Sequence, residues 1–151
     1  MRYFILAFVL SVVASVAAGQ SSPFGNQVTT WQCEQAHQRQ FPNQPAFSSQ
    51  QSYNMRLYPN GQAEVQGYIQ TAAGRAPFQS FAQWRYDGRA VIVQGQMQGG
   101  TGAMLGIGQS GGDVFILIAI PQSQAYMAFD ETQQGQGGAF TRNAAQCQRT
   151  G

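Results

Sequence analysis

Hydrophobic and polar residues alternate with a period of two along much of the chain, and Gly-containing turn sequences separate the alternating runs. In the clearest run, Tyr53, Met55 and Leu57 alternate with polar residues, and a second run (63–70) follows the Pro-Asn-Gly sequence at 59–61. A period of two is the spacing of side chains on one face of a β-strand, and Asn and Gly accept the positive φ of tight hairpin turns. The sequence therefore predicts β-hairpins, with no long helix.

Runs of the same kind extend the pattern over the rest of the chain. A second hairpin is expected from 78–86 and 89–97, around the turn at Asp87 and Gly88. The other predicted strands are 28–33, 103–109, 113–120, 125–130 and 139–142. The intervals are interpreted as a loose arm (20–27), a long connection (34–51) with one helical turn at 34–40, and a mobile Gln/Gly loop (133–138).

The strand predicted at 113–120 is the most apolar run after the N-terminus, and it is apolar on both faces. Strands that are hydrophobic throughout are typical of a sheet that is covered on both sides. We therefore expect this strand to be central and buried on both faces.

About eight short strands joined mainly by hairpins predict an all-β fold. A meander of this length commonly closes into a small antiparallel up-and-down barrel, because closure removes the exposed strand edges. The expected architecture resembles that of the lipocalins and avidins at the level of topology, and a β-sandwich is the alternative. We expect one β-barrel domain over residues 20–151.

The first 19 residues have the pattern of a secretory signal peptide. Arg2 precedes an apolar stretch, and small residues follow where a signal peptidase would cut, after Ala18 or Gly19. The apolar stretch is shorter than the ~20 residues that span a bilayer. The sequence thus predicts a secreted or periplasmic protein with no membrane span once the signal is removed.

The chain has two cysteines, Cys33 and Cys147, near the two ends of the predicted mature protein. An even number of cysteines in an exported protein usually forms disulfides. A Cys33–Cys147 bond is therefore expected to hold the first and last elements together. A metal site formed by Cys33, Glu34 and His37 is the alternative, but the spacing lacks a second ligand cluster.

Charged residues make up only 9% of the chain, and there are 25 Gln but no Lys. Dedicated nucleic-acid binders usually carry a strong basic cluster. This composition argues against nucleic acid and other acidic polymers as partners. It favours an uncharged ligand or a short-range protein contact.

The segment 106–113 matches short motifs of dinucleotide-binding proteins and serine hydrolases. Both the dinucleotide and the nucleophile-elbow motifs require a helix directly after the glycines, whereas a strand pattern follows here. A hydrolase that uses Ser110 and His37 is the remaining enzymatic alternative. We expect a protein that is not an enzyme and needs no cofactor or metal.

Large apolar and aromatic residues at alternate strand positions share one face, and this face could line the interior of a barrel. Such a cavity would suit a small apolar or aromatic ligand, although a small barrel can also fill itself with side chains. The predicted pocket residues are Tyr53, Met55, Leu57, Trp84, Tyr86, Met97, Leu105 and Phe129.

Arginines and tyrosines that would lie on the outer face of the barrel, or near its hairpin turns, form a second candidate site. Arg and Tyr are enriched in the residues that dominate protein interfaces. The predicted partner-binding residues are Arg56, Tyr58, Tyr68, Arg75, Arg85 and Arg89.

The ends of the chain resemble those of the bacterial periplasmic inhibitors of c-type lysozyme. Those proteins are small β-barrels with an aromatic-x-Cys sequence in the first strand, as at 31–33, and a second Cys in the tail, as at Cys147. The segment 72–78 departs from the inhibitory loop of that family, since it lacks the family's Ser and Tyr. The first expectation is therefore an exported ligand-binding barrel. The alternative is a protein-interaction module such as an inhibitor of lysozyme or another secreted hydrolase.

Overall fold

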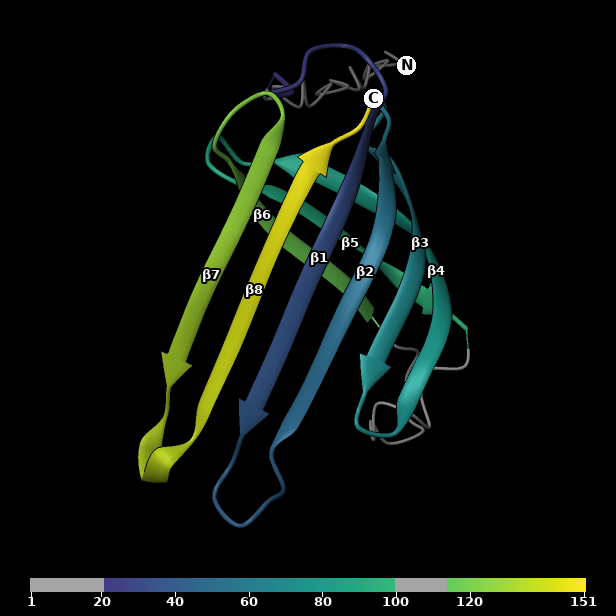
Figure 1. Cartoon of the computed structure of the whole chain (residues 1–151). Helices are drawn as coiled ribbons and strands as arrows, with labels where there is room; N and C mark the ends of the chain where they lie inside the picture. Colours follow the sequence, from purple (N-terminus) through teal and green to yellow (C-terminus); the bar gives the residue numbers. More distant parts are fainter. Residues whose placement is uncertain (1–20, 100–113) are drawn as a thin grey trace, which may run out of the picture.

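The structure is a computed structural model, and it describes residues 21–99 and 114–151. Eight antiparallel strands form one ring-like sheet in which each strand pairs with its neighbours in sequence and β8 returns to pair with β1 (Figure 1). This arrangement confirms the predicted up-and-down barrel-like fold rather than the sandwich. The strands are β1 (Thr29–Gln40), β2 (Phe47–Leu57), β3 (Gln62–Thr71), β4 (Gly74–Tyr86), β5 (Val91–Gln98), β6 (Val114–Pro121), β7 (Tyr126–Gln134) and β8 (Phe140–Arg149).

Both predicted hairpin turns are present, and local chemistry explains each of them. Between β2 and β3, Gly61 adopts a φ of 84°, and the Asn60 side-chain oxygen accepts a hydrogen bond from the Gln62 amide at 3.0 Å. Between β4 and β5, the Asp87 carboxylate accepts hydrogen bonds from the backbone amides of Arg89 and Ala90. These two amides hold the pKa of Asp87 below its usual value.

One end of the ring holds a dry core. Inward side chains of all eight strands contribute to it. Its large, fully buried side chains include Trp31, Phe115, Met55, Leu57, Leu117 and Met127. Phe24 covers this end, because its ring packs against Trp31 with 4.9 Å between centroids. The prediction of a loose N-terminal arm is therefore wrong at Phe24, which is buried in the core cluster.

The predicted disulfide is present between Cys33 and Cys147. These residues are also direct partners in the register of β1 and β8. The bond therefore joins the first and last strands at the place where the ring closes.

Four predicted element boundaries are wrong. The segment 34–51 is not a long connection, because β1 continues to Gln40 and β2 begins at Phe47. The last strand likewise runs ten residues rather than four, and β7 extends to Gln134 before a short 3₁₀ turn (Gln136–Gly138). The strand predicted at 103–109, the motif segment 106–113 and the signal peptide at 1–19 lie outside the described residues.

The strand β6 is not buried on both faces, which corrects another prediction. Phe115, Leu117 and Ala119 point into the core, whereas the side chains of Val114 and Ile116 are 53% and 48% exposed. The reason is that the ring is a single sheet. Among the described residues, no second layer packs on the outer face of β6, to which Val114 and Ile116 point.

Candidate ligand groove

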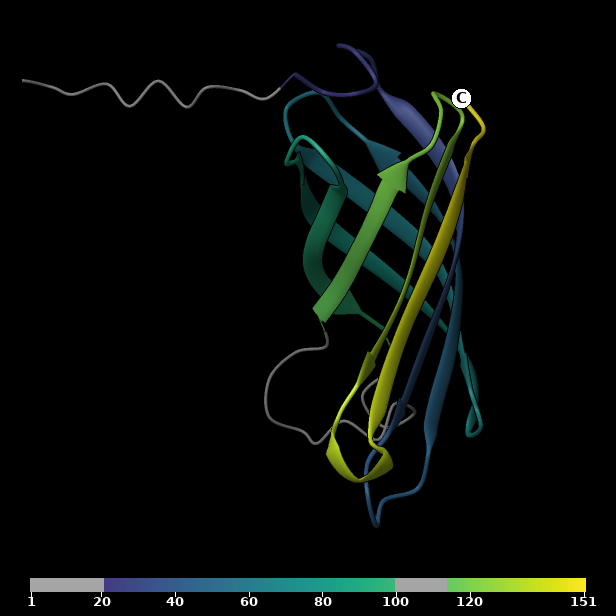
Figure 2. The same ribbon diagram turned by 90° about the vertical axis from the view of Figure 1, so that its left-hand side faces the viewer.

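A seam between β6 and β7 interrupts the otherwise continuous ring. The two strands share only two residue pairs, Ile120↔Ala128 and Pro121↔Met127, whereas β1 and β2 share eleven. Beyond the seam β7 stays paired with β8 and β6 with β5. Figure 2 shows the two strands moving apart from their shared end. In the part of the chain that the structure describes, the interior is therefore open from the side at this level.

A cavity of about 390 Å³ lies behind the seam. Residues of β1, β2, β3, β5, β7 and β8 line it together with the uncovered face of β6. Its apolar lining is Ile69, Met97, Val114, Ile116, Ile118 and Phe129, and Ala144 and Ala145 of β8 also border it. Its polar lining is Gln35, His37, Ser49, Gln51 and Asn143, with Arg39, Phe47 and Glu131 around them. A groove with one apolar and one amide-rich side suits a small, uncharged ligand.

The Gln35 side chain is fixed by hydrogen bonds at the boundary between the dry core and the groove. Its Oε1 accepts a hydrogen bond from the Tyr53 hydroxyl at 3.1 Å, and its Nε2 donates to the Ile116 carbonyl oxygen at 2.9 Å. The second bond ties β1 to the unpaired edge of β6 across the interior. Burial raises the pKa of Tyr53 far above its usual value, so the phenol remains a donor.

Gln51 lies opposite Gln35 in the register of β1 and β2 and also lines the groove. Its Oε1 is buried and has no hydrogen-bond partner among the described residues. Buried polar atoms are nearly always paired in folded proteins, because an unpaired one loses its hydration without compensation. This oxygen is the feature of the groove that most directly indicates a missing partner.

The next row of inward residues holds His37, whose direct neighbours are Ser49 on β2 and Asn143 on β8. His37 Nδ1 is hydrogen-bonded to Asn143 Oδ1. None of the described serines hydrogen-bonds to His37, so this row is a polar wall rather than an assembled nucleophile and base.

Three neighbouring side chains form the far end of the groove: Arg39, Phe47 and His37. The Arg39 guanidinium lies 4.8 Å from the centroid of the Phe47 ring, and the His37 ring lies 6.2 Å from the same centroid. These contacts hold Arg39 against an aromatic face, which is a favourable arrangement for a cation.

Of the predicted pocket residues, the structure brings Met97 and Phe129 to the groove. Tyr53 reaches it only through its hydrogen bond to Gln35, and Met55 is part of the dry core. Leu57 also packs in that core. Leu105 lies outside the described residues.

Trp84 and Tyr86 are partly buried against the core and do not line the groove. The Trp84 indole donates to the Tyr58 carbonyl oxygen at 2.7 Å, and the Tyr86 hydroxyl donates to the Gly88 carbonyl oxygen. These two aromatics therefore brace the turns of the two predicted hairpins.

The residues that sequence reasoning missed are polar ones, above all Gln35, Gln51, His37 and Asn143. The sequence does contain a signal for them. Cys33, Gln35, His37 and Arg39 are spaced two residues apart, so in a strand they would all lie on the face that carries the inward Cys33. We expected a pocket lined by apolar residues, and amide side chains did not fit that expectation.

The predicted partner-binding residues all lie on the outside of the sheet but do not form one cluster. Arg56 and Tyr58 both contact Glu64, at 3.7 Å and 2.9 Å. Tyr68 and Arg75 form a separate pair, with the guanidinium 4.2 Å from the ring centroid. Arg85 and Arg89 lie near the turn between β4 and β5.

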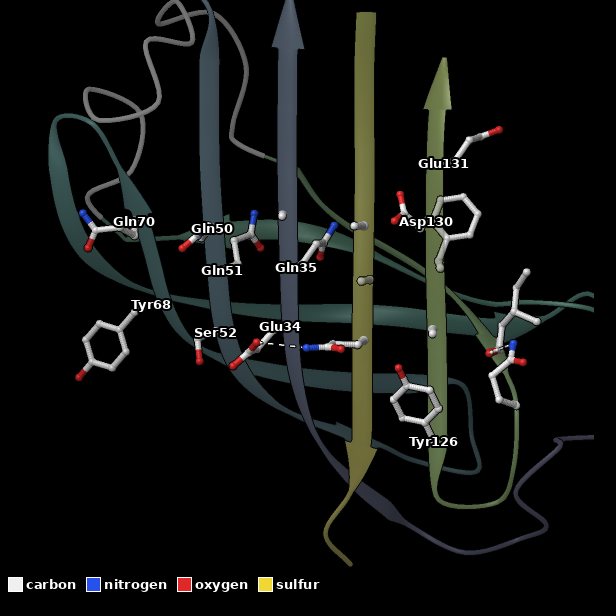
Figure 3. Close-up of a pocket in the computed structure, with 18 of the residues that line it drawn as sticks. Glu34, Gln35, Gln50, Gln51, Ser52, Tyr68, Gln70, Tyr126, Asp130 and Glu131 are labelled. Atoms are coloured by element: carbon white, nitrogen blue, oxygen red, sulfur yellow. Dashed lines mark hydrogen bonds between the residues drawn. The ribbon is translucent and has the colours of Figure 1, made fainter. Parts of the chain in front are cut away.

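A broad depression of about 930 Å³ lies partly on the outer face of β1, β2, β7 and β8, and several residues of the inner groove also border it. Figure 3 shows Tyr68 and Tyr126 on opposite sides of it, with the Gln146–Glu34 hydrogen bond between them. Ala36, Ala128 and Ala144 line it, so its floor is made of small side chains.

The metal site weighed for Cys33, Glu34 and His37 is not formed. Cys33 is disulfide-bonded and has no thiolate to offer. Within residues 21–99 and 114–151, no group of three or more His, Cys, Asp or Glu side chains could hold a metal ion.

Comparisons with known proteins give this chain no relatives. No family model matches it, and no curated protein or solved structure is significantly similar to it. The resemblance to lysozyme inhibitors therefore rests on the residues at the two ends of the chain.

Proposed function

We propose that this protein is an exported, non-enzymatic binding protein that holds a small apolar or aromatic ligand in the groove behind the β6–β7 seam. The observation that carries the proposal is the uncovered face of β6. Val114, Ile116 and Ile118 form an apolar side of a cavity of about 390 Å³, which is within the usual size range of ligand sites of roughly 300–1,000 Å³.

The export part of the proposal is supported by the disulfide and by the N-terminal sequence. Disulfides persist in oxidising compartments and are rare in the cytosol. In the part of the chain that the structure describes, no helix has the length and hydrophobicity needed to cross a membrane. Mass spectrometry of the protein purified from a secreting host tests this part, and we expect a mature chain that begins at Gly19 or Gln20.

Binding is tested with N-phenyl-1-naphthylamine, whose fluorescence rises when it enters an apolar site. We expect saturable binding to the wild-type protein and about ten-fold weaker binding to Ile116→Gln, since that change makes the apolar side of the groove polar. The matched control is Phe81→Gln, because Phe81 is 67% exposed on the outer face of β4. Equal affinity of both variants would rule out the groove as the site.

Inhibition of lysozyme or another secreted hydrolase is the second candidate function, and the Tyr68–Arg75 pair favours it. The stacked guanidinium holds an exposed tyrosine in one orientation, and such pre-ordered aromatic anchors reduce the entropic cost of binding a partner. A lysozyme activity assay tests it. Inhibition that disappears in Tyr68→Ala but not in Tyr126→Ala supports this function, and unchanged lysozyme activity opposes it.

A further inference from the structure

The position of Gln51 in the groove indicates the chemistry of the ligand more closely than an apolar cavity alone would. We infer that the ligand is a neutral molecule that carries a hydroxyl or N–H group, and that Gln51 Oε1 accepts a hydrogen bond from this group. The inference rests on the proposed function, since it concerns the same groove.

The first step is that the side-chain oxygen of Gln51 lacks a hydrogen bond, whereas the side chain of Gln35 already has its partners. Gln35 Oε1 already accepts from Tyr53 and Gln35 Nε2 already donates to Ile116. Gln51 Oε1 is buried and has no partner among the described residues. A ligand donor at this point would supply the hydrogen bond that no described residue provides.

The second step is that an apolar surface lies within the same cavity. Gln51 pairs directly with Ile69 in the register of β2 and β3, and both line the cavity with Ile116 and Phe129. The ligand is therefore expected to present a donor toward β2 and an apolar body toward β6 and β7.

The third step concerns charge, which argues for a neutral ligand at this depth. The lining holds one arginine and one carboxylate, Arg39 and Glu131, beside the single histidine. Arg39 is stacked on Phe47, and it lies four residues along β1 from Gln35, which is roughly 13 Å in an extended strand. A charged ligand group beside Gln51 would lose its hydration, and Arg39 would be too far away to compensate its charge.

The test compares three probes of nearly equal shape: 2-naphthol, which carries a donor, 2-methoxynaphthalene, which carries only an acceptor, and 2-methylnaphthalene, which carries neither. Their affinities are measured for the wild-type protein and for Gln51→Met, by competition with N-phenyl-1-naphthylamine. We expect the preference for 2-naphthol over 2-methylnaphthalene to fall about ten-fold in Gln51→Met. The preference between the two other probes is expected to stay unchanged.

Gln50→Met is the matched control, because Gln50 is the exposed neighbour of Gln51 on the outer face of β2. Circular dichroism establishes that each variant is folded, and Gln51→Leu replaces Gln51→Met if the latter is not. A naphthol preference that is the same in all variants overturns this inference while the proposed function stands. An equal gain for 2-methoxynaphthalene also overturns it, since the open group would then be a donor. Failure of all three probes to bind overturns both.

Discussion

At the scale of single residues, Tyr53 connects the dry core to the groove. Its ring packs edge-on against Phe115 at 5.3 Å between centroids, and its hydroxyl donates to Gln35. An apolar contact and a hydrogen bond thus act on the same side chain. Because Gln35 in turn bonds to the β6 backbone, Tyr53 helps to hold the orientation of the groove lining.

Tyr53 also predicts how stability depends on pH. Burial raises the pKa of the folded phenol far above its usual value of about 10, so above that pH only the unfolded chain loses the proton. The free energy of unfolding should then fall as pH rises from 9 to 11. In Tyr53→Phe this fall should be smaller by about 1 kcal/mol, measured by urea unfolding at each pH.

Tyr126→Phe is the control for this experiment, because Tyr126 is exposed on β7. Its pH dependence should match that of the wild type. Identical slopes for the wild type and Tyr53→Phe would show that the phenol titrates alike in the folded and unfolded protein.

At the scale of elements, the close contact of β2 and β3 depends on a glycine. A Cβ atom at Gly67 would lie 2.2 Å from the Ser52 carbonyl oxygen and 2.4 Å from the Tyr53 Cβ. Neither neighbour can turn away as the end of a flexible side chain would. The two strands can therefore hold this spacing only without a side chain at position 67.

Gly67→Ala should accordingly lower the free energy of unfolding by about 2–3 kcal/mol, since the added methyl forces the two strands apart. Gln66→Ala, a truncation of the exposed neighbour, should change it by less than about 0.5 kcal/mol. Chemical denaturation of the three proteins measures both effects. Equal stability of Gly67→Ala and the wild type would mean that β3 can move away from β2 without cost.

The lengths of β1 and β2 show why part of the site could not be predicted. The strands were recognised at 28–33 and 52–58, where apolar and polar residues alternate, and missed where Gln35, Gln51 and His37 take the inward positions. The alternation disappears because the interior itself is polar at this level. Alternation of apolar and polar residues reveals a strand only where the inward residues are apolar. The ends of β1 and β2 that form the groove have polar residues on both faces, so their sequences resemble a loop.

Other features were predictable because local chemistry alone determines them. Asn60 and Asp87 bond to the backbone of their own turns, and Cys33 had a single possible partner in Cys147. The divergence of β7 from β6 has no such local signature. It depends on how the whole sheet closes, which no single segment of the sequence determines.

At the scale of the whole molecule, the disulfide reinforces ring closure. Cys33 and Cys147 are 114 residues apart in sequence but are direct neighbours on β1 and β8. A cross-link over so long a loop removes many conformations from the unfolded chain, which is worth roughly 4–5 kcal/mol in the chain-entropy account.

Replacement of both cysteines by alanine should therefore lower the free energy of unfolding by about 4–5 kcal/mol. Urea unfolding of the double variant, compared with the wild type in the presence and absence of a reductant, measures the loss. The reduced wild type should match the variant. A difference below 1 kcal/mol between oxidised and reduced protein would contradict this account, since the bond would then not restrict the unfolded chain appreciably.

The pairing of β1 with β8 has a consequence for the time course of folding. If the ring is opened at its weakest junction, between β6 and β7, the first strand to be synthesised lies inside the resulting ribbon and the last strand lies beside it. A nascent chain therefore lacks one of the two neighbours of β1 until β8 leaves the ribosome. Contacts between such distant positions form slowly, so the ring is expected to close only after β8 has been synthesised.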